Sequence, residues 1–287
     1  MDITNLITLL AKVFTYVATA GVVGGFYLWQ LTRPYETESH WLQRYIMVCA
    51  GLGIAAVLIT FSTQLLMFSG QGFASFYDWE LYAILLSGKP GLSWALALGG
   101  FTSCILVAIF CLKSKLSTWL MLLGATAVMV SFTFTGHLVS APWYGKLALL
   151  LHLLAISMWV GSLLPLWHLT RIAKTEMLAR VMDNFGKLAI VFVGALLVMG
   201  VVMLQMLLGD LRLLWQTAYG QTLLIKLTLV TLLLGLGATN KLLLVPQLAK
   251  PNAIKRLRAV IGIEICTGAL VLGITAWATV VVGLDIS

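Results

Sequence analysis

Two histidines stand in a long apolar stretch, TFTGHLVSAPWYGKLALLLHLLAISMWVG, which covers residues 133–161. His137 follows one helix-length apolar segment, and His152 lies inside the next. The turn between the segments is short, so we expect antiparallel neighbouring helices with both imidazoles facing one cavity. Neutral imidazole is the commonest protein ligand for transition metals. The pattern predicts a metal site, and the alternative is a solvated His137 and a hydrogen-bonded packing role for His152.

Three methionines follow at helical spacing in the stretch MGVVMLQM. Met199, Met203 and Met206 are four and three residues apart, which predicts that they share one helical face. We expect Met203 and Met206 at the level of the two histidines, with Met67 able to join them. Thioether and imidazole together suit the soft ion Cu(I). Methionine is also a common packing residue in apolar helices, so a core role stays open.

Three polar residues are predicted at membrane depth, where such residues are costly unless paired, hydrated or functional. Lys226 lies about two turns inside an apolar segment. It could reach the membrane surface, repel cations or bind an anionic ligand. Glu264 is expected at the depth of Asn240 on the preceding segment. A hydrogen-bonded or ion-paired clamp with Asn240, Lys241 or a nearby arginine is one interpretation, and a proton relay or a cation exit site is the other.

The composition indicates that these residues lie on transmembrane helices. Hydrophobic residues make up 61% of the 287 residues and charged residues 10%, and the mean hydropathy is +1.01. This is typical of an integral membrane protein. We predict an all-α polytopic membrane bundle, a single transmembrane domain over 1–287. Its eight helices are expected at about 6–29, 41–68, 91–112, 116–136, 146–168, 187–208, 220–243 and 259–283. The stretch FASFYDWELYAILLSG predicts a further short surface helix.

The basic residues indicate how the bundle is oriented. Alternate loops hold 13 and 3 of the 18 Lys and Arg residues, which places both termini outside, on the periplasmic side of a Gram-negative cell. We expect the basic residues behind the net charge of +8 to orient the protein and to contact anionic membrane lipid. Nucleic acid is not expected as a partner. The chain has no nucleotide-binding glycine loop and no serine nucleophile elbow, so we do not expect an enzyme.

The four cysteines occur singly in apolar stretches, and this spacing predicts core residues. It offers no framework for a disulfide or a zinc site. The cysteines are Cys49, Cys104, Cys111 and Cys266.

Several fragments of the second half resemble the copper resistance protein D (CopD) family of bacterial inner-membrane proteins. They are Gly136-His137, HLLAISMWVG followed by LLPL, YGQTLLIK through ATNKLLLVP, and LRAVIGIE. The first half matches mainly in WELYAILLSGKPGLSW. The resemblance implies an eight-helix protein that carries copper inward from the periplasm, often with a periplasmic CopC-type partner.

By position in the family, His137 and His152 would be copper ligands. Lys226, Asn240 and Glu264 would be the family's polar intramembrane positions. The copper ion could be Cu(I) or Cu(II). Two other functions stay open: a b-type haem protein with both histidines as axial ligands, and a non-transporting partner of a periplasmic copper chaperone.

Overall fold

The protein is a bundle of long helices in the computed structural model, which describes residues 3–35, 39–70, 72–110, 114–136, 139–210 and 212–282. Eight helices are long and apolar enough to span a membrane. This confirms the predicted all-α membrane bundle, and the described residues contain no strand. The spanning helices are α1 (Ile3–Thr32), α2 (Ser39–Ser69), α4 (Lys89–Phe110), α5 (Lys115–Ser131), α6 (Trp143–Ile172), α7 (Thr175–Leu208), α9 (Ala218–Thr239) and α10 (Ala253–Trp277).

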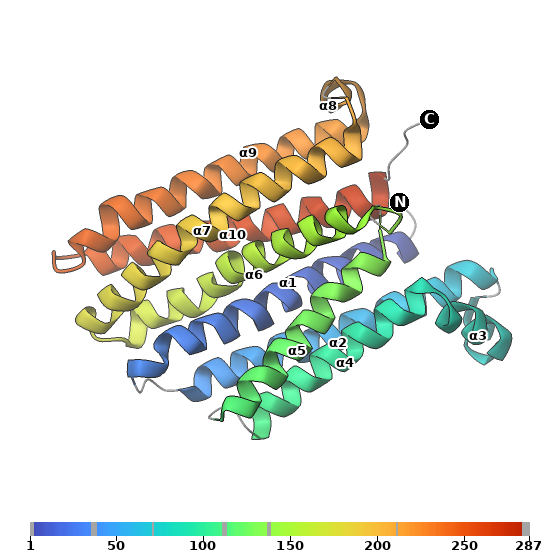
Figure 1. Cartoon of the computed structure of the whole chain (residues 1–287), viewed down its shortest axis with the longest axis horizontal. Helices are drawn as coiled ribbons and strands as arrows, with labels where there is room; N and C mark the ends of the chain where they lie inside the picture. The colour runs from blue at the N-terminus through green and yellow to red at the C-terminus, as the bar shows by residue number, and fades with distance from the viewer. Residues whose placement is uncertain are drawn as a thin grey trace.

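Two π-helical segments continue the last two spans, Asn240–Leu244 after α9 and Ala278–Val282 after α10. The predicted surface helix is present as a 3-10 turn (Gly72–Tyr77) followed by α3 (Trp79–Ser87). A single turn of helix, α8 (Leu213–Gln216), joins α7 to α9. The short helices α3 and α8 lie outside the row of spanning helices (Figure 1).

Helix α1 lies inside the bundle and contacts both α2 and α6 (Figure 1). Helices α4 and α5 form a hairpin on one side, packed against α2. On the other side, α10 contacts α6 and α9, and α7 packs on α6. Helices α7 and α9 are therefore peripheral. In the most apolar stretch of α7, 0% of the residues are buried.

The crossing of α1 and α6 is built from small residues. A Cβ added to Gly161 would overlap the backbone carbonyl of Ala20, and one added to Gly24 would overlap the backbone of Gly161. The Ser162 hydroxyl donates to the Gly24 carbonyl at 3.1 Å, and the Tyr45 hydroxyl donates to the Gly161 carbonyl at 3.0 Å. Small residues let membrane helices approach closely, and close packing drives their association. This crossing fixes the position of α6.

Helix α7 begins earlier than the sequence predicted. The polar stretch before residue 187 was expected to be a loop, because it is too polar for hydrocarbon. In the structure it continues α7 back to Thr175, with an exposed ion pair between Lys187 and Asp183 at 2.6 Å. Polarity marks where hydrocarbon ends, whereas a helix can continue into the aqueous phase when its side chains are solvated.

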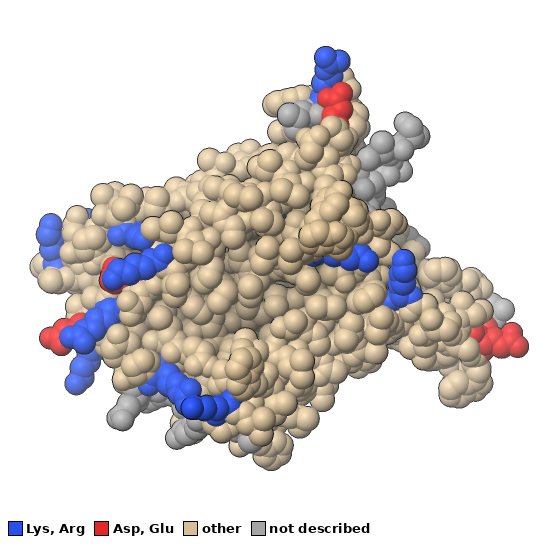
Figure 2. Space-filling model, in the orientation of Figure 1, with Lys and Arg blue, Asp and Glu red and all other residues tan. Residues whose placement is uncertain are grey.

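Charge is distributed unevenly between the two ends of the bundle. Figure 2 shows Lys and Arg gathered at the end opposite α3 and α8. The start of α1 and the end of the last span lie at the α3 and α8 end (Figure 1). This distribution favours an outward-facing α3 and α8 end by the positive-inside rule. The sidedness of the termini stays a prediction.

The cysteines follow the predicted core role only in part. Cys49 and Cys104 are buried, whereas Cys266 is exposed on α10, where a span can face lipid. Cys111 lies outside the described residues.

Candidate functional site

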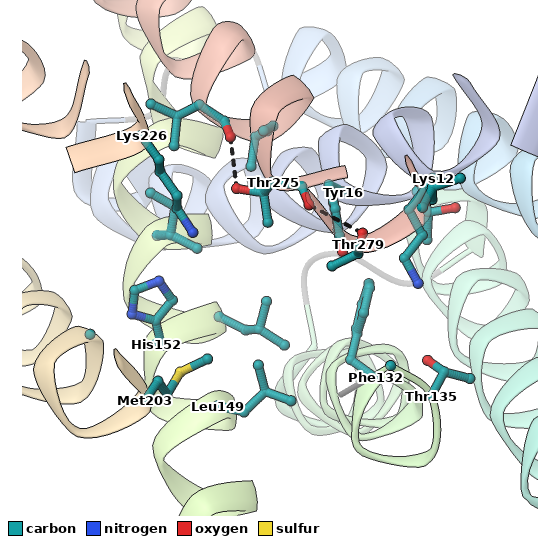
Figure 3. Close-up of a pocket in the computed structure, with 18 of the residues that line it drawn as sticks. Lys12, Tyr16, Phe132, Thr135, Leu149, His152, Met203, Lys226, Thr275 and Thr279 are labelled. Carbon is teal, nitrogen blue, oxygen red and sulfur yellow. Dashed lines mark hydrogen bonds between the residues drawn. The ribbon is translucent and has the colours of Figure 1, made fainter. Parts of the chain in front are cut away.

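A cavity of about 630 Å³ lies between the spanning helices toward the α3 and α8 end; we call it the outer cavity (Figure 3). Helices α1, α2, α4, α6, α7, α9 and α10 all contribute lining residues. Its walls are mostly apolar, with a small number of polar groups, which is the usual make-up of a small-molecule site. His152, Met203 and Lys226 all line it.

His152 projects from α6 toward α7. A Cβ added to Gly200 of α7 would lie 3.7 Å from the imidazole Cε1 and 3.9 Å from Nδ1, so the ring packs close to the α7 backbone. Nδ1 is buried and has no hydrogen-bond partner among the described residues. Buried polar atoms in proteins are nearly always hydrogen-bonded. Nδ1 is available to a ligand, while the ring also forms a hydrogen bond with the backbone of Leu196 on α7, so a packing role for the ring stays open.

His137 lies outside the described residues, so the two-histidine site stays a prediction. The preceding Gly136 does line the outer cavity. Gly136 has φ +80°, a left-handed conformation that glycine adopts without steric cost. This turn follows the 3-10 segment Phe132–Phe134 that extends α5.

The predicted methionines separate into two environments. Met203 and Met67 line the outer cavity, and Figure 3 shows Met203 on the same side of the cavity as His152. Met67 is also 55% exposed. Met206 instead packs against Gly145 of α6, where its Sδ would lie 3.1 Å from an added Cβ. Among the described residues, Met206 is not part of the cavity lining.

The outer cavity carries two lysines. The Lys226 side chain points toward the His152 imidazole and interacts with it electrostatically (Figure 3). Lys12 of α1 lies on the other side, with its Nζ 5.7 Å from the Tyr16 ring centroid and 5.8 Å from that of Phe132. Such distances are within the range of cation–π attraction. Lys12 also lines the outer cavity, so the cavity contains two lysines on different helices.

A second cavity of about 400 Å³, the inner cavity, contains the other predicted polar pair. Asn240 donates through Nδ2 to Glu264 Oε2 at 2.6 Å, so the predicted hydrogen-bonded clamp is present. Glu264 is only 2% exposed. Lys241 does not join the clamp, since its Nζ donates to the Gly186 carbonyl at 2.6 Å. Asn240 begins a π-helical segment, a feature frequent at functional sites.

One layer of side chains lines both cavities. It consists of Trp159 on α6, Val193 on α7 and Leu234 on α9. Trp159 is 4% exposed, and its Cζ2 would lie 3.3 Å from a Cβ added to Gly237. The same added Cβ would lie 3.4 Å from Glu264 Oε1. The absence of a side chain at Gly237 therefore lets the indole and the carboxylate approach the same point on α9.

The other histidines lie apart from the outer cavity. His168 stacks on Trp41 with ring centroids 4.1 Å apart, and the exposed His40 contacts Gln43 at 3.1 Å. Within the described ranges, no group of three or more His, Cys, Asp or Glu residues could hold a metal ion. Of the predicted ligands that the structure describes, His152, Met203 and Met67 line the outer cavity.

Comparison with known proteins supports the resemblance found in the sequence. The family profile "Copper resistance protein D" matches residues 179–278, which include most of α7, α9 and α10. A curated "Copper resistance protein D" from Pseudomonas syringae pv. tomato is 27% identical over 207 residues, covering 65% of this chain. The aligned region spans 66% of the length of that relative. No solved structure matches significantly. These matches show that the chain is similar to the copper resistance protein D family over α7, α9 and α10 and to one curated member over 65% of its length.

Proposed function

We propose that this protein is a copper-homeostasis protein of the bacterial inner membrane that binds copper in the outer cavity and moves it across the membrane. The observation that carries the proposal is the unpartnered His152 Nδ1 in a cavity that Met203 also lines. An imidazole nitrogen and a thioether sulfur form a donor set that selects copper over Mg²⁺ or Ca²⁺.

His137 and Met67 complete the proposed donor set. His137 directly follows Gly136, whose backbone lines the cavity, and Met67 lines it from α2. The thioethers favour Cu(I) as the bound form. The family resemblance supports delivery of copper by a periplasmic CopC-type protein at the α3 and α8 end. Met206 is left out of the site, because it packs on Gly145.

The arrangement of the two cavities supports a route for transport. The shared layer of Trp159, Val193 and Leu234 lines both the outer and the inner cavity. A rearrangement of this layer would connect them. Beyond it, Glu264 and Asn240 line the inner cavity and offer oxygen atoms there. We propose that copper passes these oxygen atoms on its way to the basic end of the bundle.

Copper binding is tested on protein purified in a neutral detergent and loaded with Cu(I). We expect near-stoichiometric copper in the wild type and in the control Met206→Leu, because that methionine packs against α6. His152→Ala should lose the copper, and Met203→Leu should bind it several-fold more weakly. Equal copper in wild type and His152→Ala would remove the basis of the site. A Soret band in the absorbance spectrum would instead identify a haem protein.

Transport is tested separately in proteoliposomes. We expect copper to accumulate with the wild type and with Met206→Leu, and not with His152→Ala. Stoichiometric binding by the wild type without accumulation would mean that the protein receives copper as a partner of a copper chaperone and transports none.

A further inference from the structure

The outer cavity is cationic. Lys226 and Lys12 line it, and of the lining residues that the structure describes, none is an aspartate or a glutamate. A free copper cation entering this cavity would be repelled by both ammonium groups. The charge of the cavity therefore favours a ligand of the opposite sign.

Lys226 has no described counter-ion. It lies inside the apolar helix α9, and no carboxylate among the described residues lies within ion-pair distance of its Nζ. A charged group at membrane depth is costly unless it is paired or hydrated. The side chain nevertheless points into the cavity, toward the His152 imidazole, whose Nδ1 is also unpartnered (Figure 3). Two unpaired polar groups thus converge on one space.

We propose that the outer cavity is a binding site for an oxyanion, a carboxylate or phosphate group held by the Lys226 ammonium next to His152. Lys12 supplies a second positive charge across the cavity. Ammonium groups bind such oxyanions as point charges, and charge-assisted hydrogen bonds are about twice as strong as neutral ones. The site goes beyond the proposed copper function, because it requires no copper.

The oxyanion could belong to a lipid headgroup or to a free small molecule. The residues Leu197 and Val201 of α7 and Leu227 of α9 line the cavity and are also 49%, 65% and 45% exposed. Apolar side chains of α7 and α9 at the cavity are thus also exposed on the outside of the bundle, where a lipid chain could lie against them. A volume of about 630 Å³ also suits a free small molecule. With an oxyanion bound beside His152, copper would enter as a neutral or anionic complex.

The test uses full-length, copper-free protein in a neutral sugar detergent. Isothermal calorimetry measures the binding of acetate, citrate and inorganic phosphate. Native mass spectrometry measures the binding of phosphatidylglycerol against phosphatidylcholine. The variants are Lys226→Met, Lys226→Arg and the control Lys89→Met, which removes an exposed charge at the start of α4. Since Lys226→Met removes a charge from an apolar helix, it is expected to fold.

We expect saturable binding of at least one of these anions to the wild type and to Lys89→Met. Lys226→Met should weaken it roughly ten- to hundredfold, as expected for loss of a charge-assisted hydrogen bond, and Lys226→Arg should retain most of it. Binding of phosphatidylglycerol alone would assign the oxyanion to a lipid headgroup, and binding of the soluble anions would assign it to a free ligand. No binding to the wild type, or equal binding to Lys226→Met, would overturn the proposal. Because no copper is present, neither result depends on the copper function.

Discussion

The hydrogen bond between Asn240 and Glu264 offers a sharp test of what stabilises the inner half of the bundle. The donor and acceptor atoms are 2.6 Å apart, and both residues are buried. The other carboxylate oxygen, Oε1, faces Gly237, which has no side chain to donate to it. Replacing Asn240 with leucine keeps the approximate side-chain volume and removes the amide donor. Glu264 would then be left buried without this hydrogen bond.

The expected loss exceeds the value of an ordinary hydrogen bond in a membrane protein. Interhelical hydrogen bonds in membranes are worth about 0.6 kcal/mol on average and about 1.7 kcal/mol at most. A buried polar group left unsatisfied costs about 1–3 kcal/mol, and more when it is charged. Because Glu264 is 2% exposed, we expect Asn240→Leu to lower the free energy of unfolding by about 2–3 kcal/mol.

The double variant Asn240→Leu/Glu264→Leu removes both polar groups and should recover most of that loss, since an apolar pair suits the site. Glu264→Gln is the matched control. Its carbonyl can still accept from Asn240 Nδ2, and its new amide can donate to Asn240 Oδ1, which is buried without a partner. Glu264→Gln should therefore be about as stable as the wild type.

The assay is equilibrium unfolding in mixed micelles, followed by tryptophan fluorescence. The reasoning predicts a coupling energy of about 2 kcal/mol between the two positions, from the cost of the group left unpaired in each single variant. Additive losses in the double variant would refute it. A Glu264→Gln variant as unstable as Asn240→Leu would do the same, because the hydrogen bond would then not be the stabilising feature.

Two further predictions concern the position of α6 and the layer between the cavities. Gly161→Val should destabilise the protein by about 3 kcal/mol in a thermal unfolding assay, because its side chain would overlap the Ala20 backbone, whereas Gly200→Ala should be tolerated. Equal stability of the two variants would contradict the packing of α1 on α6. Trp159→Ala should let copper leak through proteoliposomes faster than Trp159→Phe does, since a smaller side chain opens the shared layer. Identical copper leakage in the two variants would show that the indole does not close the route.

Hydropathy was sufficient to predict the number and order of the spans, because a hydrocarbon layer requires helices of a minimum length. The eight predicted spans are present. The ends of the helices were harder to predict. Residues 175–186 are helical although they are polar, because a helix can extend past the hydrocarbon into water.

The site was predicted only in part. His152, Met203 and Met67 were expected near one another and all line the outer cavity. Met206 was expected on the same helical face as Met203, yet it packs on Gly145. Two side chains three residues apart on a helix differ in direction by about 60° and lie about 4.5 Å apart along the axis. This difference is enough for Met203 to line the cavity while Met206 contacts a neighbouring helix.

The sequence by itself determined an eight-helix membrane bundle with one strongly basic end. Only the tertiary structure decided that Lys226 of α9 faces His152 of α6, and that Trp159 stands between two cavities. The physical reason is that a membrane helix is apolar on the lipid side and on the core side alike. Its sequence therefore lacks the amphipathic period that marks the inner face of a helix in a soluble protein, and the facing of each side chain is settled by how the helices pack.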